Sequence, residues 1–219
     1  MQEYFKILKK CLLFDGIEDA DLWRMLECLG ARVVFFDKKY TIFAEGTPAK
    51  YIGIVLSGAV QTVHVDYYGN RSIFSELGEG EVFSEAFACS GEPLLPVSVI
   101  ATEPSQIMLI DSSHILHTCA KQCLFHQRLI FNLMRNLAVK TIQFHRRVEI
   151  TSKRTTREKL LTYLAMQAKQ VGRNSFTIPF DRQELADYLE VDRSGLSAEI
   201  GKLRREGILE SEKNRFTLL

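Results

Sequence analysis

The sequence lacks the long hydrophobic run that a membrane-spanning helix requires. Its uninterrupted apolar stretches, such as residues 51–56, are far shorter than the roughly 20 residues that cross a bilayer. The N-terminal segment has no apolar core followed by a small-residue cleavage site, so a secretory signal is not expected. We therefore expect a cytoplasmic protein without a membrane partner.

Signatures of common catalytic centres are also missing. The sequence has no G-x-S-x-G nucleophile elbow, no phosphate-binding P-loop and no H-E-x-x-H zinc motif. A jelly-roll metalloenzyme such as a cupin needs a His-x-His cluster with further ligands on facing strands, whereas the strand-rich region has one histidine, His64. An enzyme is therefore not expected, and a jelly-roll metal-dependent enzyme is kept only as an alternative.

Cysteine is scarce. The five cysteines are Cys11, Cys28, Cys89, Cys119 and Cys123. Their odd number and their spacing favour reduced thiols over a disulfide scaffold. Cys119, Cys123 and His126 would share one arc of a helix, where they could hold a metal ion, but the same stripe carries isoleucine and leucine, which favours core packing. An N-terminal iron–sulfur cluster is not expected because only Cys11 lies near that end, while haem iron held by a lone histidine or a backbone nitrogen stays open.

Residues 30–110 contain short β-branched or aromatic runs that are separated by turn residues. The runs that we predict as strands are ARVVFF, YIGIVL, AVQTVHV, RSIFSEL, VSVIA and QIMLI. Breakers such as Ser57-Gly58 and Gly78-Glu79-Gly80 lie between them. Many short strands at this spacing favour a β-sandwich or a β-barrel.

From about Asp111 the hydrophobic period becomes that of a helix. One narrow stripe is formed by Cys119, Cys123, His126, Ile130, Leu133, Leu137, Thr141, Phe144 and Val148. A helix of more than 30 residues with so narrow a seam predicts a partner helix and hence a homodimer. The alternative is a helix that packs lengthwise on its own domain.

Residues 181–207 have the spacing of a helix-turn-helix unit. Asp181 with Glu184 forms a capping box, as Thr155 with Glu158 does after a predicted hinge at residues 151–154. A tight turn then leads to DRSGLSAEIGKLRREG, a second helix that begins after a capping aspartate and ends at a glycine. The small Ala186 suits the crossing of the two helices, and the segments ILES and RFTLL are predicted to form a wing.

The polar face of this second helix fits the major groove of DNA. The candidate DNA-binding residues are Arg193, Ser194, Ser197, Arg182, Gln183 and Lys202. Arg193 can span two acceptors of a guanine, the two serines are short enough to approach bases or phosphates, and the other three suit phosphates. A helix pair of this kind can also bind protein, so a non-DNA-binding adaptor is a second alternative.

These patterns together resemble the Crp-Fnr family of bacterial transcription regulators over essentially the whole chain. The resemblance rests on RQELADYLEVDRSGLSAEIGKLRREGIL, on the long preceding helix and on GEGEVFSEAFA. It implies an α+β fold: a cyclic-nucleotide-binding-like jelly roll with N-terminal helices (residues 1–110), a dimerisation helix (111–150) and a winged helix-turn-helix (151–219). It also implies a homodimer that binds two-fold-symmetric double-stranded DNA and contacts RNA polymerase, with the family's base-reading arginine at Arg193.

The DNA-binding segment departs from the family pattern at three positions. The cAMP receptor has a glutamate where this chain has Ser194 and an arginine where it has Ala198, so the same operator is not expected. The usual turn glycine is replaced by Glu190, at a site that favours a positive φ angle, which predicts a bent or strained turn.

The residues of the predicted effector pocket also depart from the family pattern. They are Phe83, Ser84, Glu85, Leu95, Pro96 and Val97. The family binds the cyclic phosphate with an arginine that precedes a serine, and Leu95-Pro96 stands there instead, so cAMP is not expected. A small apolar or aromatic effector fits this wall better, and the alternative is that these residues fill the barrel core. We predict an effector-responsive, sequence-specific transcription regulator in which the β domain shifts the helix seam and turns the DNA-binding domains.

Overall fold

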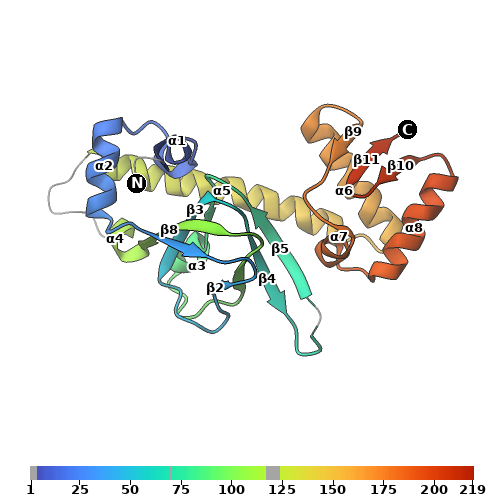
Figure 1. Cartoon of the computed structure of the whole chain (residues 1–219), viewed down its shortest axis with the longest axis horizontal. Helices are drawn as coiled ribbons and strands as arrows, with labels where there is room; N and C mark the ends of the chain where they lie inside the picture. The colour runs from blue at the N-terminus through green and yellow to red at the C-terminus, as the bar shows by residue number, and fades with distance from the viewer. Residues whose placement is uncertain (1–3, 70, 117–123) are drawn as a thin grey trace. The chain divides into compact units, whose positions relative to one another are not determined.

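The computed structural model describes residues 4–69, 71–116 and 124–219 (Figure 1). It contains two compact units, of which the first comprises residues 1–64 and 74–141 and the second comprises residues 65–73 and 142–219. Each unit is described by itself below. None of the helices in the described ranges is long and apolar enough to cross a membrane.

Two antiparallel sheets form the β part of the chain. One sheet has the order β1-β8-β3-β6, with β1 Arg32–Phe36, β8 Ser105–Asp111, β3 Tyr51–Ser57 and β6 Val82–Phe83. The other has the order β2-β7-β4-β5, with β2 Thr41–Phe43, β7 Ser98–Ala101, β4 Val60–Val65 and β5 Arg71–Leu77. Two four-stranded sheets are the architecture of a jelly roll, which confirms the predicted fold class. All six predicted strands are present, and the short β2 and β6 were not predicted.

Aromatic and branched side chains fill the space between the sheets. The buried cluster there consists of Val55, Val60, Leu77, Phe83, Val99, Ile107 and Leu109. The Phe83 ring lies so close to the backbone of Gly53 that a Cβ atom at this glycine would overlap it. Gly53 is therefore required by packing, and Phe83 occupies the interior as a core residue.

The N-terminal segment packs on the same unit as three short helices. They are α1 Phe5–Leu8, the 3₁₀ helix η2 Leu12–Phe14 and α2 Asp19–Cys28. Leu8, Leu13 and Leu22 are fully buried in one cluster with Leu129 of the long helix α5, which spans Leu124–Thr151. The burial of several leucines, each worth about 1.5–3 kcal/mol, fixes these helices against α5.

A strand end and a short helix lie at the start of the segment predicted as the long helix. Strand β8 continues through Asp111, whose carboxylate accepts hydrogen bonds from the N–H (3.0 Å) and the hydroxyl (2.7 Å) of Ser113. These bonds start the short helix α4 (Ser112–Leu116), because a carboxylate satisfies free N–H groups in the first turn of a helix. Cys119 and Cys123 lie outside the described residues. From Leu124, α5 runs for 28 residues.

The predicted seam of this helix needs a correction. His126 and Leu133 are buried within their own unit, and His126 Nε2 donates to the carbonyl oxygen of Ile115 at 2.8 Å. These two residues of the predicted stripe therefore pack on their own domain, as the alternative interpretation proposed. The large apolar side chains that α5 exposes are Phe131, Met134, Val139, Ile142, Phe144 and Val148.

The C-terminal unit combines three helices with a small sheet. Its elements are α6 Thr156–Val171, β9 Ser175–Thr177, α7 Arg182–Leu189, α8 Arg193–Arg205, β10 Leu209–Glu212 and β11 Arg215–Leu218, with the sheet order β10-β11-β9. Both predicted capping boxes are present, at Thr155 with Glu158 and at Asp181 with Glu184. This confirms the predicted winged helix-turn-helix. The two predicted wing strands pair in one sheet with a third strand, β9.

Candidate nucleic-acid interface and effector region

The α7–α8 crossing depends on a small side chain and on a left-handed turn. Ala186 is fully buried, and its carbonyl oxygen accepts from the N–H of Val191 at 3.1 Å, which closes the turn. Glu190 has φ +54°, as its place in the turn predicted. Lys159 Nζ of α6 donates to the carbonyl oxygens of Leu189 and Glu190, both at 3.1 Å, so carbonyls that α7 leaves unpaired are satisfied.

The sequence reasoning missed a residue at the end of α5 that contacts this turn. The Arg147 guanidinium stacks over the Tyr188 ring at 4.6 Å and lies 3.5 Å from a carboxylate oxygen of Glu190. Burial lowers the pKa of Arg147 from its ordinary value, while Tyr188 and Glu190 act in the opposite direction. Glu190 therefore supplies a negative charge to a buried cation, which a glycine at the same position would not do.

Asp192 caps helix α8 and holds the side chain of Ser194 in its first turn. Its carboxylate accepts from the N–H of Gly195 at 2.7 Å and from the hydroxyl of Ser194. The bond from Ser194 is the main cause that lowers the pKa of Asp192, and the bond from Gly195 adds to it. Because the Ser194 proton points to Asp192, the Ser194 oxygen is left to accept hydrogen bonds from outside the protein.

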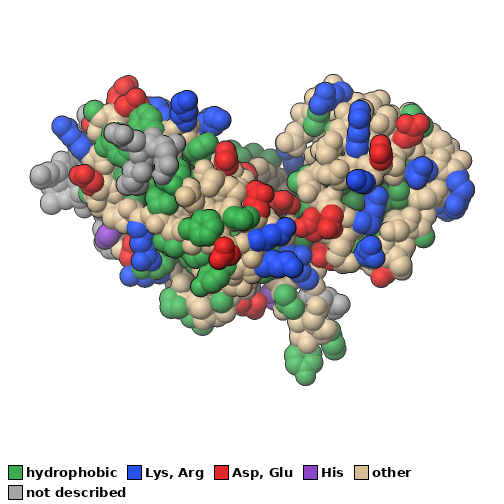
Figure 2. Space-filling view, viewed as in Figure 1, with side chains coloured by type: hydrophobic (Ala, Val, Ile, Leu, Met, Phe, Trp, Pro, Cys, Tyr) green, Lys and Arg blue, Asp and Glu red, His purple; other side chains and the backbone are tan. Residues whose placement is uncertain are grey.

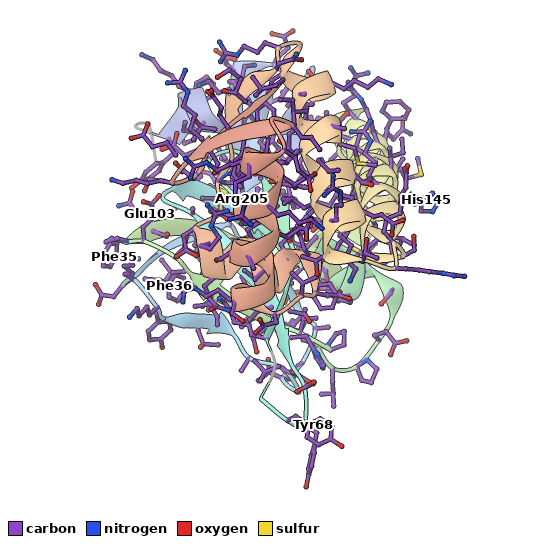
Figure 3. All side chains as sticks on the ribbon, turned by 90° about the vertical axis from the view of Figure 1, so that its right-hand side faces the viewer. Phe35, Phe36, Tyr68, Glu103, His145 and Arg205 are labelled. Carbon is purple, nitrogen blue, oxygen red and sulfur yellow. The ribbon has the colours of Figure 1, made fainter. Side chains whose placement is uncertain are left out.

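Helix α8 has one buried face and one exposed polar face. Leu196, Ile200 and Leu203 are buried, as their spacing predicted. The exposed face carries Arg193, Ser194, Ser197, Ala198 and Lys202. Figure 3 turns this helix toward the viewer, with Arg205 labelled on its last turn. Five of the six candidate DNA-binding residues are exposed, which leaves their polar atoms accessible to a ligand.

The sixth candidate, Arg182, lies partly buried at the start of α7. Its guanidinium stacks over the Phe216 ring at 5.6 Å and donates to the carbonyl oxygen of Lys213 at 3.2 Å. Burial and the positive charge of Arg193 lower the pKa of Arg182. The positive charges of Arg182 and Arg193 repel each other. This repulsion favours the binding of an anion at the N-terminal end of α8. Gln183 differs, because its amide donates to Asp187 at 2.8 Å.

Cations of the wing and of the end of α8 were not among the candidate DNA-binding residues. Arg204 and Arg215 line a hollow of about 400 Å³ together with Glu210, Ser211, Glu212 and Thr217. Lys213 lies in the turn between β10 and β11 at φ +50°. Figure 2 shows Lys and Arg side chains on the visible face of the C-terminal part, with acidic side chains among them. The signal was present in the sequence as a basic residue before the predicted wing and two more at its turn.

The predicted effector residue Glu85 faces helix α5. It lies in the first turn of α3 (Glu85–Ser90), and its carboxylate accepts from Asn136 Nδ2 at 2.9 Å. Lys140 Nζ lies 2.7 Å from the same carboxylate and also donates to the carbonyl oxygen of Val82. The side chain of Glu85 is only 2% exposed. Glu85 thus joins the β domain to α5 through buried hydrogen bonds.

The other predicted effector residues differ in exposure. Phe83 is a core residue, Leu95 and Val97 are buried, and Pro96 is exposed. Ser84 has φ +63°, and its buried hydroxyl has no hydrogen-bond partner among the described residues. An effector pocket made by these residues stays a prediction. In the described part of the chain, no group of three or more His, Cys, Asp or Glu side chains is arranged to hold a metal ion.

Two family models match the chain. Residues 33–122 match the cyclic nucleotide-binding domain, and residues 158–219 match the Crp-like helix-turn-helix domain. A curated relative, the potassium channel KAT1 of Oryza sativa subsp. japonica, is 24% identical over 112 residues. That match covers 51% of this chain and 15% of the channel, so the chain spans a small part of this relative.

Solved structures with a similar fold cover most of the chain. FixK2 from Bradyrhizobium japonicum has a TM-score of 0.66 and 21% identity, covering 86% of this chain and 92% of its own. The c-di-GMP-responsive global regulator CLP of Xanthomonas campestris has a TM-score of 0.74 and 16% identity, with 91% and 99% covered. TTHB099, a transcriptional regulator of the CRP family from Thermus thermophilus, has a TM-score of 0.61 and 20% identity, with 85% and 91% covered.

Proposed function

The chain belongs to the Crp-Fnr family of transcription regulators, and we propose that it binds duplex DNA sequence-specifically as a homodimer. The observation that carries this proposal is the exposed N-terminal half of α8. There, Arg193 and two serines are accessible, and Arg182 provides a second positive charge. A helix that presents such groups at its N-terminal end can place them against base edges in a major groove.

Each side chain has a distinct role in this proposal. Arg193 donates to two acceptors of a guanine, and Ser194 accepts from a base amino group, such as N4 of cytosine or N6 of adenine. Ser197 approaches a base or a phosphate. Arg182 and Lys202 contact phosphates, which position the protein without specifying sequence. Gln183 joins them when its amide leaves Asp187.

The homodimer forms through the exposed apolar face of α5. Phe131, Met134 and Ile142 are each more than half exposed on this helix, and a cluster of exposed large apolar side chains marks an interaction surface. Pairing of two copies along this face covers them and presents two α8 helices to one duplex. Met134→Glu places a charge in the paired face, so we expect monomers in sedimentation, whereas Gln143→Glu serves as a control on the same helix.

The remaining parts of the proposal rest on family membership. They are response to a small-molecule effector other than cAMP, contact with RNA polymerase and action in a bacterial cytoplasm. A non-DNA-binding adaptor is the second candidate, since the wing also carries acidic residues. Salt dependence separates the two functions, because release of counterions from phosphates makes DNA affinity fall steeply with ionic strength.

The test selects tightly bound duplexes from a random library and titrates the selected duplex with the full chain. Arg193→Ala should lower affinity for the selected duplex by about tenfold or more, because a bidentate contact to guanine contributes about 1–3 kcal/mol. Arg173→Ala, which removes an exposed arginine between α6 and β9, is the matched control. Equal affinities of both variants and the unchanged chain would contradict the assignment of Arg193.

A further inference from the structure

An open groove lies on the β unit, beside the predicted effector residues Phe83 and Leu95. Its volume is about 610 Å³, which falls within the range of about 300–1,000 Å³ typical of small-molecule sites. It is lined from strands β1, β2, β3 and β8 and from the loop that follows β2. None of the residues that line it belongs to the predicted pocket.

The floor of the groove is apolar and partly aromatic. Val34 and Phe36 of β1, Ile42 and Phe43 of β2, and Leu109 of β8 line it. These side chains also border the buried cluster between the two sheets, so they are held in place by packing from behind. A floor of this kind accepts a flat hydrophobic body, whose burial contributes about 25 cal/mol for each Å² removed from water.

One end of the groove is cationic. The Arg32 guanidinium lies 5.0 Å from the centre of the Tyr51 ring, and Lys50 Nζ lies 5.3 Å from the same centre. Lys50 is paired with the Asp111 carboxylate at 3.0 Å. Among the residues that the structure describes, Arg32 forms no ion pair with a carboxylate, so its positive charge is uncompensated there. Tyr51 fixes the guanidinium by stacking at the groove.

We propose that this groove binds a small aromatic carboxylate. The ring of the ligand lies on the apolar floor, and its carboxylate pairs with Arg32, for which a planar guanidinium offers two parallel donors. A neutral ligand or a cation would not form this ion pair with Arg32. The site itself does not depend on DNA binding, whereas its role as an effector site rests on the proposed function.

A short route connects the groove to the long helix. The Phe43 ring lies 5.6 Å from the Phe83 ring, and Phe83 is two residues before Glu85. Glu85 holds Asn136 and Lys140 of α5 through its carboxylate. A ligand that contacts Phe43 therefore lies one ring away from the segment that ends in these bonds. A ligand bound in the groove would alter α5 through the segment from Phe83 to Glu85.

The experiment titrates the full chain with 2-naphthoate, in the absence of DNA, and measures heat by calorimetry. We expect saturable binding of one equivalent per chain, and weaker binding of the uncharged naphthalene-2-carboxamide. Arg32→Gln should weaken 2-naphthoate binding by about tenfold, because it removes a charge-assisted hydrogen bond from an exposed site. Arg24→Gln, which removes an exposed arginine on α2, should leave the affinity unchanged.

A second variant keeps the test independent of Arg32. Ala44→Trp adds a large ring to the exposed side chain that lines the groove and should abolish binding without disturbing the core. Absence of 2-naphthoate binding to the unchanged chain, or an affinity in Arg32→Gln and Ala44→Trp equal to that of the unchanged chain, would overturn the proposal. Binding that persists in a chain that fails to bind DNA would leave this site intact and remove only its role as an effector site.

Discussion

The ion pair between Glu85 and Lys140 predicts how a substitution at Lys140 changes the stability of the first unit. Glu85 is almost fully buried, and it has two side-chain donors, Asn136 and Lys140, at 2.9 and 2.7 Å. Lys140→Met removes one donor and leaves a buried carboxylate with reduced compensation. Breaking a fully buried pair costs about 3–5 kcal/mol, and since the Lys140 side chain is 29% exposed, we expect a smaller loss of about 2–3 kcal/mol.

The assay is urea unfolding followed by the fluorescence of Trp23, the single tryptophan of the chain. Trp23 lies on α2 and stacks on Phe5 at 5.7 Å, so its signal reports the first unit and not the DNA-binding unit. Lys38→Met, which changes an exposed lysine in the loop after β1, is the control and should change the free energy of unfolding by less than about 0.5 kcal/mol.

A double-mutant cycle separates the pair from general effects of substitution. Glu85→Gln alone should cost about 1 kcal/mol, because a neutral amide can still bond to Asn136 while Lys140 reaches solvent. The double variant Glu85→Gln with Lys140→Met should be more stable than the sum of the two single losses predicts, by at least about 1 kcal/mol. Additive losses, or a loss in Lys140→Met no larger than in Lys38→Met, would refute the reasoning.

Three further predictions concern the DNA-binding unit. Ala186→Leu should destabilise it by about 1–3 kcal/mol in thermal melts followed by circular dichroism, since the added atoms have no space at the crossing of α7 and α8; an unchanged melting temperature would contradict this. Ser194→Ala should reduce discrimination at one base pair of the selected duplex while leaving the salt dependence of binding unchanged, as measured by titrations of single-base variants. Because the pKa of Asp192 is lowered from 3.8, its stabilising contribution is present above that pH and is lost as the pH falls through the lower pKa of the folded state; Asp192→Asn should flatten this acid-induced loss of helix signal.

Local signals in the sequence predicted the C-terminal unit closely. The capping residues Thr155, Asp181 and Asp192 all accept the expected backbone hydrogen bonds, because capping depends on residues three positions apart. The left-handed Glu190 was predicted for the same reason, since turn geometry is also local. Its pairing with Arg147 was not, because that contact joins residues 43 positions apart in the sequence.

The β unit and the long helix show where sequence patterns fail. Strands β2 and β6 are three and two residues long, too short for an alternating pattern to show. Helix α5 has apolar residues on two faces, and periodicity alone does not tell which face packs on its own unit. His126 and Leu133 were therefore placed on the dimer seam, although they are buried in the same unit. The hydrogen bond from Asn136 of α5 to Glu85 was not predicted, because the two residues are 51 positions apart in the sequence.

The central claim is that two copies of α8 bind one duplex through two equivalent half-sites. The most direct measurement combines selection from a random duplex library with the sedimentation of the selected complex. The account predicts an inverted repeat whose half-site centres are about 34 Å, or one helical turn, apart, with two chains bound to each duplex. No enriched sequence, or a single half-site bound by one chain, would contradict it.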